Sequence, residues 1–522
     1  MEKKSSLFVI LGYLYLIIPN LIFVIGWCNP PTAIICSIVL LYGFYFLCKN
    51  APELWVPESR KERILLLLVF FIAFLWVYLA GIGGFSFQNF DHTYRNEIFE
   101  LLADREWPVV INRYYCTMVY YIGFWMPAAL ITKINGEFIL GYFVQLLWAT
   151  FGVFLVFYYI LAALKKKVLW PIFLFIFFSG MDIIGLYFFN KGLYATFFFS
   201  SLIETWAIPH IFSSMTYLLF WVFNQALPAW VFTFLLLHQK NNKNIIFLMV
   251  ILLIFSTLPA FGATPFALYF CLKNGEEDLR KILTFSHIKK AICSALSFPN
   301  ISALLFLFPV IYLYFAHNFM YGTFGMASEL HDTIIQEGEF ALDFDRIWKY
   351  IRFFILEAGI LIFCLFFYQK KNPLLYIVFI TLVSGAFLKI GYGMDFEMRT
   401  SIPALVFLFY LTVKTLQECD LNRHKIIVSI MLIFLAIGTV TPIQEFGRIY
   451  KQRKFQTDVR AMKIDLTHVP PNMNFFGRIY KNTFLKYFGK QNEKIRVLNG
   501  AVEKLAEEQK RARAREREKT KE

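Results

Sequence analysis

The chain has 522 residues, of which 58% are hydrophobic and only 17% are charged. Soluble domains carry about 25% charged residues, so this composition excludes an ordinary water-soluble protein and indicates that lipid surrounds most of the chain. The formal net charge of +15 does not indicate a nucleic-acid partner, because the basic residues form short clusters between apolar runs and in a C-terminal tail.

Apolar runs long enough to cross a bilayer recur along the chain. The first run is too long for a signal sequence and no small-residue cleavage pattern follows it, so we expect a retained helix. The sequence therefore predicts an all-α, polytopic membrane bundle of about thirteen transmembrane helices. The expected spans are residues 6–27, 32–48, 64–84, 138–161, 168–188, 213–237, a short pair within 244–272, 300–317, 348–368, 374–390, 401–413 and 426–440.

Basic clusters between the runs orient these helices. Cytoplasmic loops of membrane proteins are enriched in lysine and arginine, which predicts a multi-pass protein of the inner (plasma) membrane with a cytoplasmic N-terminus and an outer C-terminus. The clusters are Lys3 and Lys4; Lys49 with Arg60, Lys61 and Arg63; residues 165–167; Lys240 with Lys243; residues 280–290; Lys370 with Lys371; and Arg423 with Lys425.

One aromatic run, residues 115–131, does not fit this alternation. If it crossed the membrane, the lysines at 165–167 would lie outside, so we expect it to lie at the outer interface, where aromatic rings prefer the headgroup level. A first large outer loop, residues 85–137, then holds two juxtamembrane helices. The other is expected at 91–102, with Asp91 or Thr93 as its cap, and Trp107-Pro108 ends it.

The predicted domains follow from this layout. Residues 1–442 form the transmembrane domain, residues 443–501 a small outer C-terminal region, and residues 502–522 a charged tail that is a solvated helix or disordered. Further outer segments are expected at 190–212, 318–345 and 391–400.

The first outer loop opens with a cluster of polar residues that starts at Asp91. On a helix, Asp91 and Arg95 share one face, so a carboxylate that acts as a general base and a guanidinium that binds phosphate would point the same way. Asn96 is a further candidate contact to the substrate. The alternative is structural: Asp91 caps the helix and Arg95 is its surface partner.

A second group of candidates is Asp182, Glu204 and His210. Asp182 lies in the outer half of an apolar run, where a lone acid needs a partner or a water-filled cavity. Glu204 belongs to an interfacial segment, and a single histidine such as His210 is more often structural than catalytic.

The third group is Asp395 and Arg399, between two expected spans. This position is the outer membrane boundary, where a lipid-linked phosphate is presented, and Arg399 is the preferred phosphate contact because guanidinium binds phosphate with two donors. An ordinary polar connector is the alternative. Neither the scattered cysteines nor any other ligand spacing predicts a metal site, and no soluble hydrolase, ATPase or dehydrogenase motif is present.

This outer loop, which follows an early helix, opens with an acid and contains two juxtamembrane helices, resembles the GT-C glycosyltransferase superfamily. The stretch WPVVINRYYCTMVYYIGFWMPAALITKINGE is also similar to the Pro-containing aromatic stretch of bacterial lipid-linked sugar transferases. The resemblance implies an enzyme that takes sugar from a polyprenyl-phosphate carrier outside the cytoplasm. It implies a catalytic role for Asp91, with Asp182 or Glu204 as a second carboxylate. The first loop here has no DxD or ExD pair.

The expected reaction transfers a sugar to a cell-envelope acceptor, with Asp91 as base and Arg95 or Arg399 stabilising the leaving phosphate. It needs no nucleotide sugar or soluble cofactor; a divalent metal would be compatible with it, but no ligand spacing supports one. Two alternatives stay open. One is a polysaccharide polymerase or ligase, and the other is a transporter or flippase, which would place its polar groups near the bilayer midplane.

Overall fold

The computed structural model describes residues 4–111, 116–164, 167–189, 203–316, 344–385, 395–419, 424–452, 476–478, 483–490, 495–497 and 500. Helices dominate this part of the chain, and eight are long and apolar enough to cross a membrane. The structure thus confirms a helical membrane protein, while the count of about thirteen spans stays a prediction. The eight are Leu7–Trp27, Pro30–Lys49, Arg60–Leu79, Phe138–Ala163, Met215–His238, Phe298–Ala316, Ile347–Gln369 and Lys425–Lys451.

Helices α2 and α3 begin where their sequences carry capping signals. Asn29 accepts a hydrogen bond from the Thr32 amide before α2, and Ser59 and Glu62 form a capping box before α3. A two-stranded pairing of β1 with β2 brings Lys4 beside the connection from α2 to α3. The elements are β1 (Lys4–Ser5), α1 (Leu7–Trp27), α2 (Pro30–Lys49), β2 (Leu54–Trp55) and α3 (Arg60–Leu79).

The first outer loop contains the expected helix at its start, but residues 116–125 are not the juxtamembrane helix that we predicted. Strand β4 pairs with β3 and with β5, so its backbone groups are satisfied in a sheet, and Tyr120, Tyr121 and Trp125 are buried against protein. The elements are α4 (Asp91–Asp104), β3 (Val110–Ile111), β4 (Cys116–Met118), the 3-10 turn η2 (Gly123–Trp125), α5 (Met126–Asn135), α6 (Phe138–Ala163) and β5 (Phe476–Arg478).

The expected span at 168–188 is broken into two short helices, α7 (Trp170–Ile176) and α8 (Asp182–Phe189). The break is held by other segments: the Met181 amide donates to the Leu356 carbonyl, and the Phe178 carbonyl accepts from the Met215 amide. A continuous helix would leave these partners unsatisfied. The turn η3 (Ile203–Ala207) packs on α8.

Helix α10 (Met215–His238) lies at the centre of the molecule and is buried along almost its whole length. It contacts α1, α6, α11 (Ile245–Leu252), α12 (Thr257–Lys273) and α22 (Ile402–Glu418). Two amphipathic helices, α13 (Leu279–Ile282) and α14 (Phe285–Ala295), follow α12. The next span is continuous through α15 (Phe298–Ser302), the π-helical η4 (Ala303–Leu307) and α16 (Phe308–Ala316).

The last spans carry one correction. We predicted that the final apolar run ends at Val440, but helix continues through α24 and packs against α10 and α8, because Glu445 finds buried partners there. The elements are α18 (Phe344–Phe354), the π-helical η5 (Ile355–Gly359), α19 (Ile360–Gln369), α20 (Pro373–Gly385), α21 (Asp395–Thr400), α23 (Lys425–Gly438), α24 (Val440–Gln452) and α25 (Thr483–Tyr487). The predicted tail at 502–522 and most of the 318–345 segment lie outside the described residues.

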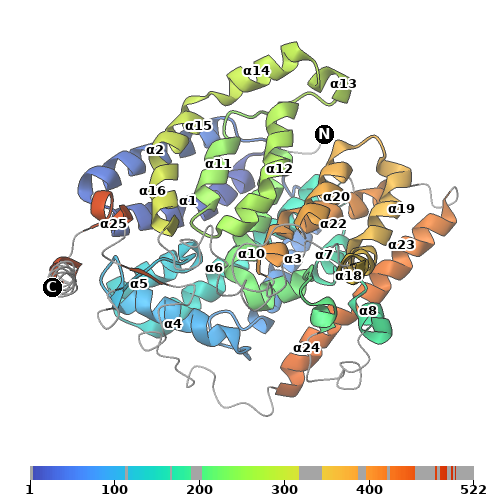
Figure 1. Ribbon diagram of the computed structural model, residues 1–522, viewed down its shortest axis with the longest axis horizontal. Coiled ribbons are helices and arrows are strands. Elements are labelled where there is room, and N and C mark those ends of the chain that lie inside the picture. Colours follow the sequence, from blue (N-terminus) through green and yellow to red (C-terminus); the bar gives the residue numbers. More distant parts are fainter. Residues whose placement is uncertain are drawn as a thin grey trace, which may run out of the picture.

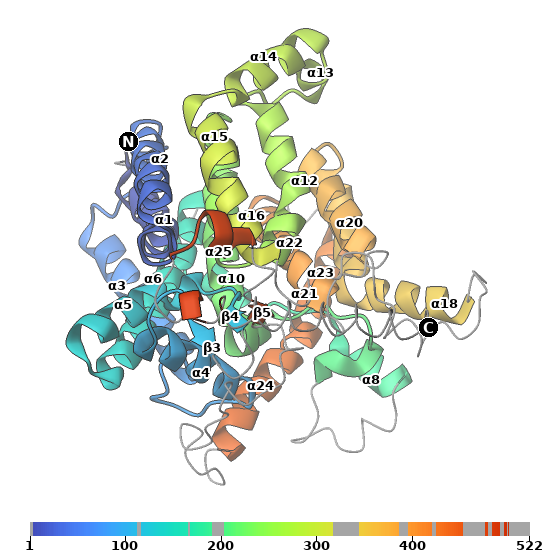
Figure 2. The same cartoon turned by 60° about the vertical axis from the view of Figure 1, so that its left-hand side comes forward.

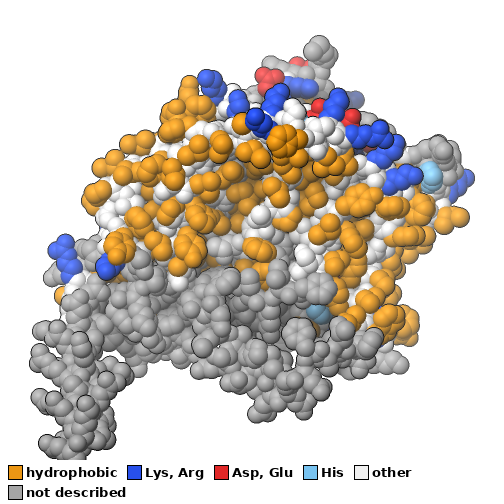
Figure 3. Space-filling view, turned by 45° about the horizontal axis from the view of Figure 1, so that its top comes forward, with side chains coloured by type: hydrophobic (Ala, Val, Ile, Leu, Met, Phe, Trp, Pro, Cys, Tyr) orange, Lys and Arg blue, Asp and Glu red, His pale blue; other side chains and the backbone are white. Residues whose placement is uncertain are grey.

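The molecule has two chemically different ends. One end carries α13, α14 and the connection from α19 to α20, and α4, α8 and α24 lie at the other (Figures 1 and 2). Lysines and arginines gather along the first end above a broad surface of hydrophobic side chains (Figure 3). We call it the basic end, defined by Lys240, Lys243, Arg280, Lys281, Lys289, Lys290, Lys370 and Lys371.

Candidate functional site

A kink in α10 positions the start of α4. Val222 departs from helical geometry (φ −134°, ψ 27°), and the carbonyl of Phe220 accepts from Asn89 Nδ2 at 2.8 Å and faces His92 Nε2 at 3.1 Å. Burial first, and the Arg95 charge second, lower the pKa of His92 to about 3. His92 is therefore neutral, and its Nε2–H donates to the carbonyl that the kink exposes.

Asp91 and Arg95 form the ion pair that their spacing predicted. Arg95 Nη2 donates to Asp91 Oδ2 at 3.3 Å, and Arg95 packs over the Phe223 ring on α10. The Asp91 side chain is 44% exposed, whereas that of Arg95 is only 9% exposed. Arg95 Nη1 is also 3.3 Å from Oδ2, but neither Nη1 nor Nε makes a hydrogen bond. The pair thus combines an accessible carboxylate with a buried guanidinium that has unused donors.

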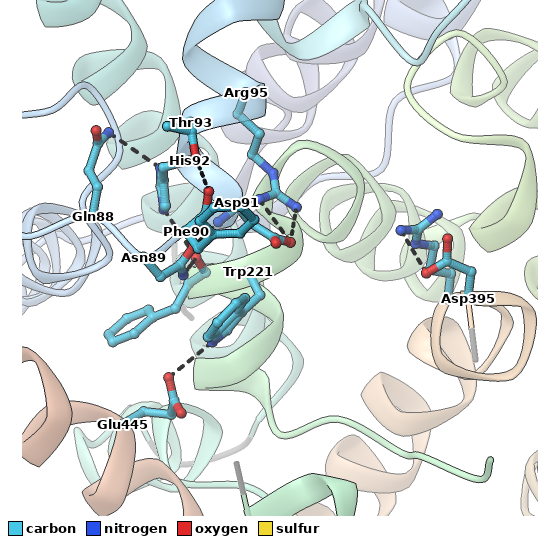
Figure 4. A network of polar contacts seen from close by, with 12 residues as sticks. Gln88, Asn89, Phe90, Asp91, His92, Thr93, Arg95, Trp221, Asp395 and Glu445 are labelled. Atoms are coloured by element: carbon cyan, nitrogen blue, oxygen red, sulfur yellow. Dashed lines mark hydrogen bonds and ion pairs between the residues drawn. The ribbon is translucent and has the colours of Figure 1, made fainter. Parts of the chain in front are cut away.

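A second pair of the same kind comes from α21. Arg399 lies 3.0 Å from Asp395 Oδ1, is 14% exposed, and its buried Nε also lacks a hydrogen-bond partner. In Figure 4 Asp395 lies to the right of Asp91 and Arg95. Burial raises the pKa of Tyr120, and the charges of Arg399, Arg95, Asp395 and Asp91 all act on its phenol. Both pairs are therefore near enough to Tyr120 for their charges to act on it, and we call Asp91, Arg95, Asp395 and Arg399 the pair site.

Two other predicted residues lie apart from these pairs. Asn96 exchanges hydrogen bonds with Gln88, at 2.8 Å from Nδ2 to Oε1, and is buried in the packing of α4. His210 Nδ1 lies 2.9 Å from Glu397 Oε2. Burial raises the pKa of Glu397, and the bond to His210 opposes that rise. The structure thus gives Asn96 a structural partner and gives His210 a carboxyl partner that the sequence did not single out.

Asp182 belongs to a separate, fully buried group at the break between α7 and α8. Its Oδ2 accepts from Ser179 Oγ at 3.0 Å and from Thr441 Oγ1 at 2.8 Å. The carboxyl group of Glu357, on the π-helical η5, is near enough to Asp182 for the two charges to interact. Trp206 Nε1 donates to Glu357 Oε1 at 2.8 Å, and the buried Oε2 of Glu357 has no hydrogen-bond partner.

Glu204 is the third carboxyl of this group. Its Oε1 accepts from the Ser214 amide at 2.9 Å and from the Ser214 hydroxyl, while its buried Oε2 has no hydrogen-bond partner. Burial, and then the charge of Asp182, raise the pKa of Glu204 well above its usual range. We call Asp182, Glu204 and Glu357 the buried carboxyl group.

Glu445 on α24 lies beyond the buried carboxyl group and next to α10. Trp221 Nε1 donates to its Oε2 at 3.1 Å, and Arg448 Nη2 donates to the same oxygen at 2.6 Å. Figure 4 shows Trp221 directed at Glu445. Among the acids discussed above, Asp91 and Asp395 are partly exposed, whereas Asp182, Glu204, Glu357 and Glu445 are buried.

Sequence reasoning missed Glu357 and Glu445. The rule that marked Asp182, an acid within an apolar run, applies equally to Glu357 in the run ILEAGILIF and would have found it. We had assigned Glu445 to the outer C-terminal region, because the expected last span ends at Val440. Within the described residues no three His, Cys, Asp or Glu side chains are placed to hold a metal ion.

No protein-family model, no curated protein and no solved structure matches the chain significantly. Function must therefore be argued from the site itself.

Proposed function

We propose that this protein is an integral membrane glycosyltransferase that moves a sugar from a polyprenyl-phosphate donor to an acceptor of the cell envelope. The observation that carries the proposal is the pair site: the accessible carboxylate of Asp91 lies beside Arg95, Arg399 lies beside Asp395 on α21, and each arginine has a donor without a hydrogen-bond partner. A transfer with a phosphate leaving group requires a carboxylate that acts as a base and guanidinium donors that are available to bind the phosphate.

In this reaction Asp91 removes the proton from the acceptor hydroxyl or amine. The acceptor atom then bonds to the anomeric carbon of the sugar, and the bond between that carbon and the phosphate oxygen breaks. The electron pair leaves with the lipid phosphate, whose growing negative charge Arg95 and Arg399 stabilise. Asp395 orients Arg399 from 3.0 Å away.

The position of the pair site supports an extracytoplasmic reaction. The site lies at the end of the molecule opposite the basic end, where Figure 1 places α4 and the lower part of the bundle. If the positive-inside rule sets the orientation, the basic end faces the cytoplasm and the pair site faces outward, where polyprenyl-linked sugars are used by enzymes of the GT-C type.

The test is transfer of labelled sugar from a polyprenyl-phosphate donor in membranes that contain the wild type, Asp91→Asn or Asp104→Asn. Asp104 ends the same helix and is exposed, so it is a matched control for loss of one carboxylate. We expect Asp91→Asn to lose about 10²- to 10⁴-fold in rate, the usual contribution of a general base, and Asp104→Asn to retain activity. Equal losses in both variants would refute the role of Asp91.

Proton-coupled transport is the second candidate, and the buried carboxyl group favours it. Buried acids and interrupted helices mark substrate and proton pathways in transporters, and Asp182 lies at such an interruption. Proteoliposomes that acidify on addition of a substrate gradient, with no sugar transfer in membranes, would favour this candidate over the glycosyltransferase.

A further inference from the structure

A polar cavity of about 600 Å³ opens among the helix ends at the basic end. It is bounded by the last residues of α6, α10, α12 and α19, by the start of α20, and by α22. Its volume lies in the range of small-molecule sites, about 300–1,000 Å³. Its charged lining residues are Lys273, Glu277, Lys371 and Lys414.

The charge in this cavity is positive after internal pairing. Lys273 Nζ lies 2.7 Å from Glu277 Oε1, which neutralises the one acid of the lining. Within the described part of the chain, neither Lys371 nor Lys414 makes an ion pair, and Lys414 is only half-buried on α22. Lys371 and Lys414 thus share a concave site whose one lining acid is already paired with Lys273, so an anion would balance their charge.

Polar groups around the lysines suit an oxygen-rich ligand. The phenol rings of Tyr269, Tyr368 and Tyr410 line the cavity, and the buried Nε2 of His238 has no hydrogen-bond partner. A phosphate accepts hydrogen bonds from ammonium and phenol groups, and a neighbouring headgroup hydroxyl donates to an unprotonated imidazole nitrogen.

The outer faces of the same helices point to a lipid as the source of the phosphate. Leu268, next to Tyr269 on α12, is 60% exposed, and Phe366 and Phe367, next to Tyr368 on α19, are 45% and 48% exposed. These apolar side chains lie on the surface that acyl chains cover in a membrane. Basic pockets between transmembrane helices are known to hold anionic headgroups.

We propose that this cavity binds a phosphate group carried by an anionic phospholipid. Lys371 and Lys414 neutralise the headgroup, the tyrosines and His238 bond its oxygens, and the acyl chains lie along α12 and α19. The proposal does not depend on sugar transfer, because its residues lie at the other end of the bundle and its readout is binding.

The test titrates the purified full-length protein in neutral detergent with soluble short-chain phosphatidylglycerol, with the matched phosphatidylcholine, and with inorganic phosphate. The variant K371Q/K414Q removes the unpaired charges of the cavity. The control K289Q/K290Q removes two exposed lysines of α14 at the same end, outside the cavity lining.

We expect the wild type and the control to bind phosphatidylglycerol in preference to phosphatidylcholine. The cavity variant should bind it roughly 30-fold more weakly, the equivalent of about 1 kcal/mol for each lysine. Equal weakening by both variants would overturn the proposal, because it would show diffuse surface charge. If inorganic phosphate bound as tightly as phosphatidylglycerol, the proposal that a lipid carries the phosphate would be wrong. If phosphatidylcholine bound as tightly as phosphatidylglycerol, the proposed selectivity for an anionic headgroup would be wrong.

Discussion

Replacing Glu204 by glutamine should change how stability depends on pH. Glu204 is 2% exposed, and burial together with the Asp182 charge raises its pKa well above the ordinary value of 4.5. In the folded protein Glu204 keeps its proton, while in the unfolded chain it releases it. The unfolded state therefore binds fewer protons, and the wild type loses stability as pH rises from the ordinary pKa toward the raised one.

The size of this effect follows from linkage. The slope is about 1.4 kcal/mol for each pH unit between the two pKa values. A glutamine side chain does not titrate, so the free energy of unfolding of Glu204→Gln minus that of the wild type should increase with pH, at up to this slope, once the pH exceeds the ordinary carboxyl pKa. The amide oxygen of the variant still accepts from Ser214, and any constant cost of the substitution drops out of the slope.

The assay is denaturant unfolding in detergent micelles, followed by tryptophan fluorescence at several pH values. Glu58→Gln is the control, because Glu58 is an exposed carboxyl in the turn before α3. The Glu58 variant should run parallel to the wild type. If Glu204→Gln also ran parallel between about pH 5 and about pH 8, Glu204 would be ionised in the folded state and the reasoning about the buried carboxyl group would be wrong.

Two packing predictions concern the elements that hold these sites. Gly262→Ala should lower the free energy of unfolding by about 1–3 kcal/mol and reduce sugar transfer, because a Cβ there would overlap the Thr400 carbonyl oxygen of α21. The control is Gly447→Ala, which has open space around it and should change the free energy of unfolding little in the same assay. Asn300→Ala should lower stability by about 1–3 kcal/mol, because its Oδ1 accepts from the buried Phe247 amide at 3.0 Å; an unchanged midpoint of thermal unfolding would contradict that role.

Parts of the candidate site were predictable because they are local. Asp91 and Arg95 are one helical turn apart, and the sequence predicted both the helix and the ion pair that α4 contains. Asp395 and Arg399 are also one helical turn apart, on α21, but the sequence predicted neither this helix nor their ion pair. The local pattern also did not contain the position of Tyr120 near both pairs, since this depends on the strand and turn that replaced the expected interfacial helix.

The buried carboxyl group could not be assembled from the sequence. Its Asp182 bonds to Thr441, 259 residues away. Outside this group, His210 bonds to Glu397, 187 residues away. Applying the rule for acids in apolar runs consistently would have marked Glu357, but no rule of spacing assigns it to Asp182 rather than to another helix.

The sequence alone determined that this chain is a helical membrane protein, where most of its apolar helices lie, and which end is basic. These properties follow from composition, run length and the distribution of lysine and arginine, all of which are local. The tertiary structure decided that one apolar run breaks at Asp182, that α24 extends the last run, and which buried acids lie close together. The physical reason is that lipid and protein interior are similarly apolar, so a helix buried in protein, such as α10, carries almost the same pattern as one that faces lipid.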